Sequence, residues 1–336
     1  MPVRLKDIAQ DLGVSVVTVS KVLRGNADIG NETRQRVLDR MKELHYRPNM
    51  IARGLASGRT FTVGLVVPDL VHPYFAEFAK SVSGYLRDHQ YALILASSEE
   101  DPEVERQEIR TLLSRGVDVL IIASCQPNLA DFYELGQERT PYLLFDRNFA
   151  QLDTHFVGSD DVQVGRIATE HLISLGRKRI AHIGGRNTSP SIDRLRGYRE
   201  ALAEANITVP ENYIVTFEKT EESGDSAGHG AMETLLALSP RPDAVFCYND
   251  LTAIGAIDAA RKAGLRVPED IAFIGCGNLR YDDYLQVPLS SVEHNTAELG
   301  RIAGEFALEL SRNPTQPSRQ FLLPSRVIVR TSSVAS

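Results

Sequence analysis

The chain has 336 residues, of which 43% are apolar and 24% charged, with three cysteines, no tryptophan and a formal net charge of −7. This composition is typical of a soluble globular protein of two or three domains. The sequence has no apolar run of about 18 residues, no leader peptide and no Cys/His cluster with metal-ligand spacing. We therefore expect a cytoplasmic protein without a membrane span, a metal or a cofactor.

The charge is divided unevenly along the chain. Residues 1–60 carry 11 Lys and Arg against 6 Asp and Glu, a net charge of +5, which leaves −12 for residues 61–336. A small basic segment on a larger acidic body is typical of a module that binds a polyanion and is joined to a domain with another task.

Residues 4–24 predict two short helices joined by a tight turn. The helices cover residues 5–12 and 15–23, and the second begins with a serine that can bond the unpaired N–H groups of its first turn. Ala9 allows close approach, Gly13 permits the positive φ of a turn, and Val19 fills the wedge between the helices. This spacing indicates a helix-turn-helix, whose second helix enters the DNA major groove; an ordinary helical hairpin is the alternative.

A third helix is predicted over residues 31–44, so that residues 1–47 form a compact helical head. Residues 48–60 (PNMIARGLASGRT) follow as a hinge with room for about two helical turns, which is too short to persist alone in water. Its apolar Leu55 is the type of side chain that wedges into a DNA minor groove. We expect the hinge to fold against DNA, with a plain flexible linker as the alternative.

From residue 61 to the end, apolar strands alternate with helices. Strands are expected at 61–67, 91–96, 117–122, 142–145, 180–184, 213–217, 244–248 and 271–275, with short strands near 319–323 and 327–330. Helices are expected at 74–90, 104–115, 129–135, 162–175, 192–205, 224–238, 251–263 and 296–310. This pattern predicts parallel sheets with helices on both faces, in two similar lobes. The expected fold class is an all-α helix-turn-helix head on an α/β body.

Ligands of open parallel sheets bind beyond the carboxyl ends of the strands. The residues that this rule selects are Asp69, His72, Tyr74, Phe75, Ser97, Ser98, Ser124, Asp146, Arg147, Gly184, Arg194, Asn249, Asp250, Gly277 and Asn278. Amides, carboxylates and an arginine suit a hydroxyl-rich ligand, although each residue alone is also an ordinary turn or cap residue. No P-loop, nucleophile elbow or acid/base pair is evident, so no catalytic residue is expected.

The succession of parts resembles the lac repressor (LacI/GalR) family of bacterial transcription regulators, whose body is similar to type I periplasmic sugar-binding proteins. The resemblance spans nearly the whole chain and is carried by LKDIAQDLGVSVVTVSKVLRG, RVLDRMKELHYRPNMIARGLASGRT, VGLVVPD, FDRN, HFVGSDDVQVGRIATEHLISLGRKRIAHIGG, RLRGYREAL, PDAVFCYNDLTAIGAI, AGLRVPEDIAFIGCGN and PLSSVEHN. It implies a ligand-responsive, sequence-specific DNA-binding regulator, a repressor of carbohydrate utilisation or transport genes. Such a protein acts as a homodimer on a near-palindromic double-stranded DNA operator, in response to a sugar or sugar derivative.

In the head, the resemblance implies roles for eight residues. Base contacts are expected from Val16, Val17 and Lys21, with the lysine donating to guanine and the valines packing on thymine methyl groups. Insertion into the minor groove is expected from Leu55, next to Ala52. Phosphate contacts are expected from Thr18, Ser20 and Asn26.

In the body, the resemblance makes Arg194 the residue that clamps the effector. The other expected effector contacts are Asp69, Tyr74, Phe75, Asp146, Asn249, Asn278 and Asp225. Asp225 stands where many sugar-binding members have an aromatic residue, and Gly277 where many have an acidic one, so Asp225 either accepts a bond, binds a cationic group or is solvated. The lobes are expected to comprise 61–159 with 293–320, and 161–290 with 322–336.

Two other classes of protein share parts of this pattern. A periplasmic-type solute-binding protein would have the same body, but the basic head and the lack of a signal peptide disfavour it. An α/β enzyme would need a nucleophile or an acid/base set in the cleft between the lobes, and none is evident.

Overall fold

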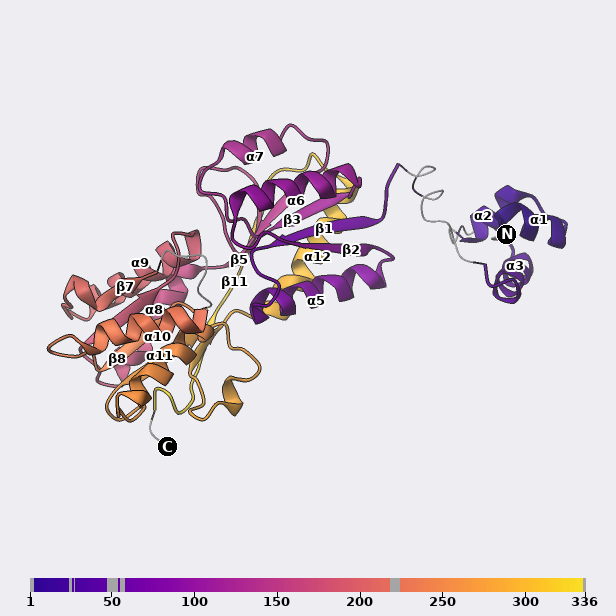
Figure 1. Ribbon diagram of the computed structural model, residues 1–336. Helices are drawn as coiled ribbons and strands as arrows, with labels where there is room; N and C mark the ends of the chain where they lie inside the picture. The colour runs from indigo at the N-terminus through magenta and orange to yellow at the C-terminus, as the bar shows by residue number, and fades with distance from the viewer. Residues whose placement is uncertain are drawn as a thin grey trace. The chain divides into compact units, whose positions relative to one another are not determined.

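The computed structural model describes residues 3–23, 26, 28–46, 54, 58–217 and 224–334. The chain divides into two compact units, Met1–Thr60 and Phe61–Ser336 (Figure 1). Within the described ranges, no helix is both long enough and apolar enough to cross a lipid bilayer.

The first unit is an all-α head, as the sequence predicts. It contains α1 (Leu5–Leu12), α2 (Val16–Leu23) and α3 (Asn31–Glu43). All three helices contribute to one small apolar core, which is made of Ile8, Ala9, Val19, Val22, Val37 and Met41. Because so few side chains are buried, we expect the free energy of unfolding of the isolated head to be small.

The first lobe of the second unit is a six-stranded sheet covered by helices on both faces. Its strands are β1 (Thr62–Val67), β2 (Ala92–Ser97), β3 (Val119–Ile122), β4 (Tyr142–Phe145), β5 (His155–Ser159) and β11 (Gln320–Leu323), in the order β11-β5-β4-β3-β1-β2. Each pair of neighbours is parallel. The helices α5 (Pro73–Asp88) and α12 (Thr296–Arg312) cover one face, whereas α6 (Pro102–Ser114) and α7 (Ala130–Leu135) cover the other (Figure 1).

The second lobe repeats this plan. Its strands are β6 (Ile180–Gly184), β7 (Ile214–Thr216), β8 (Ala244–Cys247), β9 (Ala272–Cys276), β10 (Ser291–Glu293) and β12 (Arg326–Ile328), in the order β12-β10-β9-β8-β6-β7. The helices α8 (Asp161–Ser174) and α9 (Ser189–Glu204) pack on one face, and α10 (Gly224–Leu236) and α11 (Asp250–Lys262) on the other. Two short 3₁₀ turns, Glu211–Tyr213 and Asp282–Tyr284, complete the lobe. The predicted fold class is confirmed, with one difference: β12 is antiparallel to β10.

The chain passes between the lobes three times, and the exact positions differ from those expected. Glu293 belongs to β10 and therefore to the second lobe, not to the start of a first-lobe segment. Leu322 and Leu323 pair with β5 in the first sheet, so the last passage follows residue 323 rather than 321. The ends of the lobe segments are set by the hydrogen bonds of the short edge strands β11 and β12, and residue type alone does not specify this pairing.

Candidate functional site

The turn between α1 and α2 is built from the residues that the sequence singles out. Gly13 adopts φ +66°, a backbone conformation that favours glycine. The N–H of Thr18 donates to Ser15 Oγ at 3.0 Å, so Ser15 caps α2. Ala9 and Val19 are buried in the common core of the head. These features make α1 and α2 a helix-turn-helix.

The side chains expected to read bases lie on the exposed side of α2. Val17 is 60% exposed and Val16 is 45% exposed, whereas Val19 is fully buried. Both exposed valines are therefore accessible to a partner, and their contact with DNA bases stays a prediction. Lys21 Nζ lies 2.5 Å from Asp28 Oδ2, with both side chains over one-third exposed. An exposed pair of this kind is weak, so a DNA base can compete for the ammonium group.

The expected phosphate-contacting residues have different surroundings. The hydroxyl of Thr18 lies 2.8 Å from Ser15 Oγ, and Ser20 is half-buried. Asn26 is exposed, and its backbone carbonyl accepts from Arg34 Nη2 at 2.6 Å. Ala52 and Leu55 lie outside the described residues, so the hinge contact stays a prediction.

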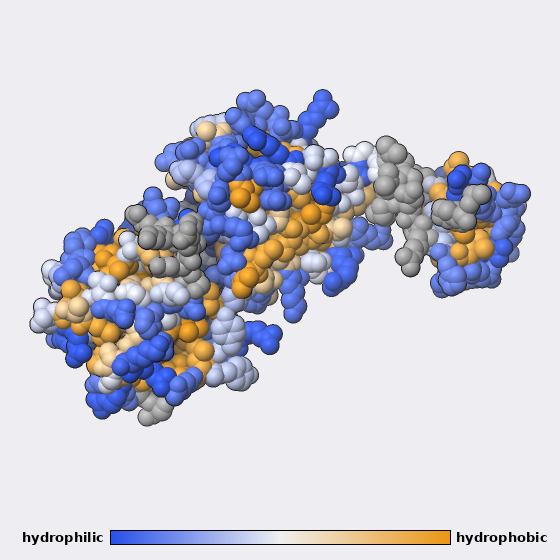
Figure 2. All heavy atoms as spheres, in the orientation of Figure 1, coloured by the Kyte–Doolittle hydropathy of each residue, from blue (hydrophilic) through white to orange (hydrophobic). Residues whose placement is uncertain are grey.

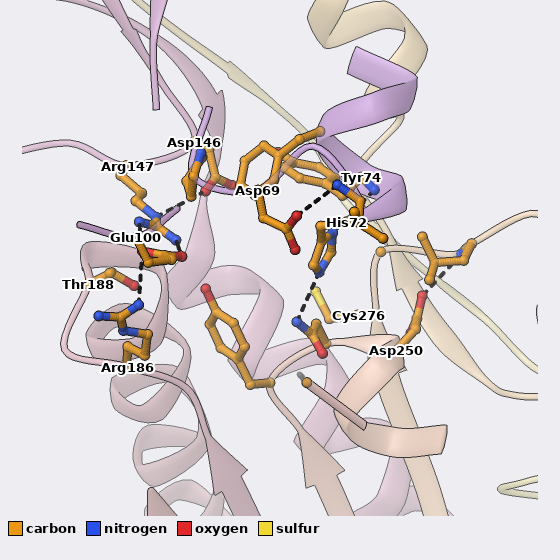
Figure 3. A pocket seen from close by; sticks show the side chains of 18 of the residues that line it. Asp69, His72, Tyr74, Glu100, Asp146, Arg147, Arg186, Thr188, Asp250 and Cys276 are labelled. Carbon is orange, nitrogen blue, oxygen red and sulfur yellow. Dashed lines mark hydrogen bonds and ion pairs between the residues drawn. The ribbon is translucent and has the colours of Figure 1, made fainter. Parts of the chain in front are cut away.

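The second unit contains a cavity of about 380 Å³ between its lobes, a size suited to a small molecule. Its walls come from segments that follow strands of both sheets, as the strand-end rule requires (Figure 3). The lining residues are Pro68, Asp69, Val71, His72, Tyr74, Phe75, Glu99, Glu100, Asp146, Arg147, Arg186, Thr188, Arg194, Phe217, Gly224, Tyr248, Asn249, Asp250, Cys276, Gly277, Leu279 and His294.

Six of the eight expected effector contacts line this cavity, namely Asp69, Tyr74, Phe75, Asp146, Arg194 and Asn249. Asn278 is not among the lining residues, although its neighbours Gly277 and Leu279 are. Its side chain donates to Glu293 Oε1 at 3.1 Å and accepts from Arg330 Nη2 at 2.8 Å, and its contact with the effector stays a prediction. Asp225 is not a lining residue either, although the adjacent Gly224 is.

Arg194, on α9, is a buried cation on the wall of the cavity. Its Nε donates to Asp161 Oδ1 at 2.8 Å and its Nη1 to the Tyr248 carbonyl at 2.7 Å. The guanidinium lies 4.8 Å from the centre of the Tyr248 ring, a cation–π distance. Burial raises the pKa of Asp161 to about 6, although the charge of Arg194 opposes this shift. Arg194 is thus held in place by a carboxylate, a carbonyl and an aromatic ring.

Direct contacts link the two lobes across the cavity. His72 Nε2, from the first lobe, lies 3.3 Å from Asn249 Nδ2, whose Oδ1 caps α11 by accepting from Thr252 N at 2.8 Å. Burial lowers the pKa of His72 to about 4, so this histidine is neutral at physiological pH. The backbone N–H of Asn148 also donates across the lobes, to Ser189 Oγ at 2.9 Å.

His294, which also lines the cavity, lies between Arg194 and the segments that join the lobes. His294 Nε2 lies 3.4 Å from Arg194 Nη2 and 2.8 Å from Cys276 Sγ. Its Nδ1 lies 3.0 Å from the hydroxyl of Ser159, the last residue of β5. Ser159 and His294 stand at two of the three interlobe passages, so this chain of contacts runs from Arg194 to the segments that join the lobes.

A second charged cluster lines the cavity and consists of Glu100, Arg147 and Arg186, none of which is among the eight expected effector contacts. Arg147 donates to both carboxylate oxygens of Glu100, at 2.9 and 2.6 Å, and Arg186 Nη1 lies 3.2 Å from Glu100 Oε2 (Figure 3). Arg147 was selected by the strand-end rule, and Glu100 and Arg186 each lie within three residues of a strand end. A rule that selects every charged residue within three positions after a strand would also have selected Glu100 and Arg186.

Gly277 stands where the resemblance leads one to expect an acidic residue. A Cβ atom at this position would lie 3.0 Å from Asp250 Oδ2. The Asp250 carboxyl group is fully buried, accepting from Ser291 Oγ at 2.6 Å and from Leu279 N at 3.1 Å. Asp250 thus fills the space beside Gly277, but its oxygens are already bonded within the lobe.

The cysteines and histidines do not form a metal site in the described part of the chain. No group of three or more His, Cys, Asp or Glu there has a geometry that would hold an ion. Cys125, Cys247 and Cys276 are reduced thiols, and burial raises the pKa of each well above its ordinary value. The thiols are therefore protonated at neutral pH.

A helix-turn-helix head joined to a two-lobed body with a ligand cavity defines a ligand-responsive, DNA-binding transcription regulator. Residues 4–49 match the family described as "Bacterial regulatory proteins, lacI family", and residues 169–333 match the "Periplasmic binding protein-like domain".

Similar proteins match over nearly the whole length. The ribose operon repressor of Haemophilus influenzae is 34% identical over 330 residues, which cover 98% of each chain. The transcriptional repressor PurR of Klebsiella pneumoniae is 35% identical over 333 residues, 98% of this chain and 96% of the relative. Among solved structures, the CelR–cellobiose complex is 29% identical with a TM-score of 0.75, covering 98% of this chain and 99% of that chain.

The fold agrees still more closely with the lac repressor dimer bound to operator and the anti-inducer ONPF. The TM-score is 0.85 at 24% identity, over the full length of both chains. The chain belongs to the LacI family of bacterial regulatory proteins, and the predicted DNA-binding regulator is confirmed over a solute-binding protein.

Proposed function

We propose that this regulator is a repressor of genes for the use or transport of a carbohydrate, and that it acts in the cytoplasm without catalysing a reaction. The observation that carries the proposal is the cavity between the lobes, with the buried Arg194 on its wall. Six polar or aromatic residues, Asp69, Tyr74, Phe75, Asp146, Arg194 and Asn249, would contact the effector. Relatives named for ribose and cellobiose support a carbohydrate ligand.

The head would read a near-palindromic operator, one half-site for each subunit. Val16, Val17 and Lys21 would contact base edges, and the exposure of both valines supports this role. Thr18, Ser20 and Asn26 would contact phosphates and set the orientation of the head. The hinge would fold on DNA and insert Leu55, next to Ala52, into the minor groove. The head would thus span residues 1–47, the hinge 48–60 and the effector-binding body 61–336.

The body would hold two subunits together. β2 is an edge strand of the first sheet, and its Leu95 is 40% exposed, with Leu93 and Ile94 half-buried beside it. Figure 2 shows a band of hydrophobic residues across this part of the first lobe. An apolar edge strand is a natural surface for association with a second copy.

Effector binding would act on the closure of the lobes. The cleft is bridged by His72–Asn249 and by the network of Arg194, His294 and Ser159. A ligand that contacts both walls has different affinities for the open and closed arrangements, and this difference alone can shift the equilibrium between them. In the dimer, the shift would change the spacing of the two hinges and thereby the affinity for the operator.

The proposal is tested in two steps on the full chain. A preferred operator is first selected from random double-stranded DNA, and we expect a near-palindromic sequence. Affinity for that operator is then measured in the presence of a panel of sugars, nucleosides and amino acids. A sugar that changes the affinity at least about tenfold, equivalent to about 1.4 kcal/mol of coupling, supports the proposal. A response only to a ligand of another class would contradict the carbohydrate assignment.

A further inference from the structure

Two arginines from different lobes meet at one carboxylate in the cavity. Arg147 follows β4 of the first lobe and forms a two-pronged pair with Glu100, with distances of 2.9 and 2.6 Å. Arg186 follows β6 of the second lobe and approaches the same carboxylate at 3.2 Å. Figure 3 shows Glu100 between the two guanidinium groups. A pair of guanidinium groups converging on one group of oxygens is the arrangement that binds carboxylates and phosphates.

The Arg147 side chain is buried and does not lie on the protein surface. It is only 6% exposed, and the Nε atom is buried with no hydrogen-bond partner among the described residues. Apart from Glu100, the nearest carboxylate is that of Asp146, whose Oδ2 lies 3.8 Å from this Nε. Without Glu100, the two guanidinium groups of Arg147 and Arg186 would lie beside the cavity, and within the described residues Arg147 would keep one carboxylate within 4 Å, that of Asp146.

The backbone at Glu100 and at the residue before it has a positive φ angle. Glu100 has φ +57° and the preceding Glu99 has φ +50°, and non-glycine residues in this region are strained. Burial alone would raise the pKa of Glu100, but the hydrogen bond and charge of Arg147, with the charge of Arg186, hold it below the ordinary value. The side chain is thus a permanent anion at neutral pH. The ion pairs of Glu100 and the backbone hydrogen bonds from Glu100 N to the Pro68 carbonyl and from Asp101 N to the Ser98 carbonyl hold the loop in this form.

We propose that Glu100 is the residue that sets the charge selectivity of the cavity, as an internal counter-ion that fills an oxyanion site formed by Arg147 and Arg186. The site's natural ligand is therefore an uncharged polyhydroxylated molecule, and derivatives that carry a phosphate or carboxylate are excluded. Asp69 and Glu99, which also line the cavity, add further negative charge to its walls. This inference rests on the proposed function in one respect, namely that the cavity is the effector site.

The test uses inorganic phosphate as the probe and Glu100→Gln as the variant. The amide keeps the shape of the side chain and removes its charge, which leaves both arginines available to the phosphate. Phosphate binding to the full chain is measured by calorimetry and by thermal shift, against sodium chloride at equal ionic strength. We expect Glu100→Gln to bind phosphate at least about tenfold more tightly than the wild type, because two charge-assisted contacts become available.

Matched variants show whether the effect belongs to this position. Glu99→Gln removes the same charge from the cavity wall one residue away, where no ion pair to an arginine exists in the described part of the chain. It should therefore raise the affinity for phosphate far less than Glu100→Gln does. Adding Arg186→Gln to Glu100→Gln should abolish the gain. Equal phosphate affinity of wild type and Glu100→Gln would overturn the proposal. If Glu100→Gln is unfolded in chloride, phosphate must restore its fold, and failure to do so would also overturn it.

A second arm separates this inference from the proposed function. The wild type is titrated with matched pairs, D-ribose with D-ribose 5-phosphate and D-glucose with D-glucuronate. Tighter binding of an anionic member than of its neutral partner would overturn the charge selectivity while leaving a sugar-responsive regulator intact. If no sugar changes operator affinity but the phosphate result holds, the oxyanion site stands and the carbohydrate assignment fails.

Discussion

Replacing Arg194 by alanine separates the binding role of this residue from its structural one. Arg194 is 5% exposed, and its guanidinium group is bonded to Asp161 and the Tyr248 carbonyl. Its removal leaves the Asp161 carboxyl group buried without its counter-ion. Removing one partner of a buried ion pair costs about 3–5 kcal/mol, so we expect the body to lose this much stability near pH 7.5.

The loss should depend on pH with a definite sign. In the wild type, the pKa of Asp161 is about 6, above the ordinary value of 3.8, so its contribution to stability falls as the pH rises from about 4 to 6. Without Arg194, whose charge lowers that pKa, the pKa rises further and the fall continues above pH 6. Each pH unit is equivalent to about 1.4 kcal/mol, so the deficit of Arg194→Ala should grow by about 2 kcal/mol between pH 6 and 7.5.

The assay is urea unfolding followed by far-ultraviolet circular dichroism, since the chain has no tryptophan. The control is Arg196→Ala on the same helix, where the side chain is 58% exposed and pairs only with Asp193 in the described structure. This control should change stability by less than about 0.5 kcal/mol at any pH. A deficit for Arg194→Ala that is independent of pH, or no larger than that of Arg196→Ala, would refute the reasoning about Asp161.

Three further changes test other parts of the account. Val17→Ala should weaken operator binding without changing the stability of the head, whereas the buried Val19→Ala should lower the free energy of unfolding by about 2 kcal/mol; equal effects on stability would contradict the assigned faces of α2. Lys21→Ala should relax base preference at one position of each half-site, at a cost of about 1–3 kcal/mol, and a uniform loss across all sequences would mean a phosphate contact instead. Leu95→Lys should weaken the dimer in sedimentation velocity, and an unchanged dimer would exclude the β2 edge from the interface.

The sequence predicts most of the fold because its signals are local. The α1–α2 turn follows from Gly13 and a capping serine, and the long helices follow from the spacing of their apolar residues. β5 and β10 are not predicted, since short runs that contain Ser or Gly become strands only through pairing with neighbours. The strand near 327–330 is predicted, but its antiparallel direction is not, because strand direction is a property of the chain path and not of residue type.

The candidate site is predictable to the extent that it follows strand ends. This rule finds Asp69, Asp146 and Asn249 but also selects Asn278, which is not a lining residue and whose side chain is bonded to Glu293 and Arg330. Which way a strand-end side chain points depends on partners from distant segments. The strand-end rule also fails to predict the ion-pair cluster of Glu100, Arg147 and Arg186. These residues lie on separate loops, and only folding brings their charges together.

The most direct test of the central claim is the affinity for the selected operator as a function of effector concentration, in the wild type and in Arg194→Ala. The account predicts that the effector changes the affinity of the wild type at least about tenfold and leaves that of Arg194→Ala unchanged, while both proteins bind the operator equally without effector. An undiminished response in Arg194→Ala would contradict the account, because the effector would then act from somewhere other than the cavity between the lobes.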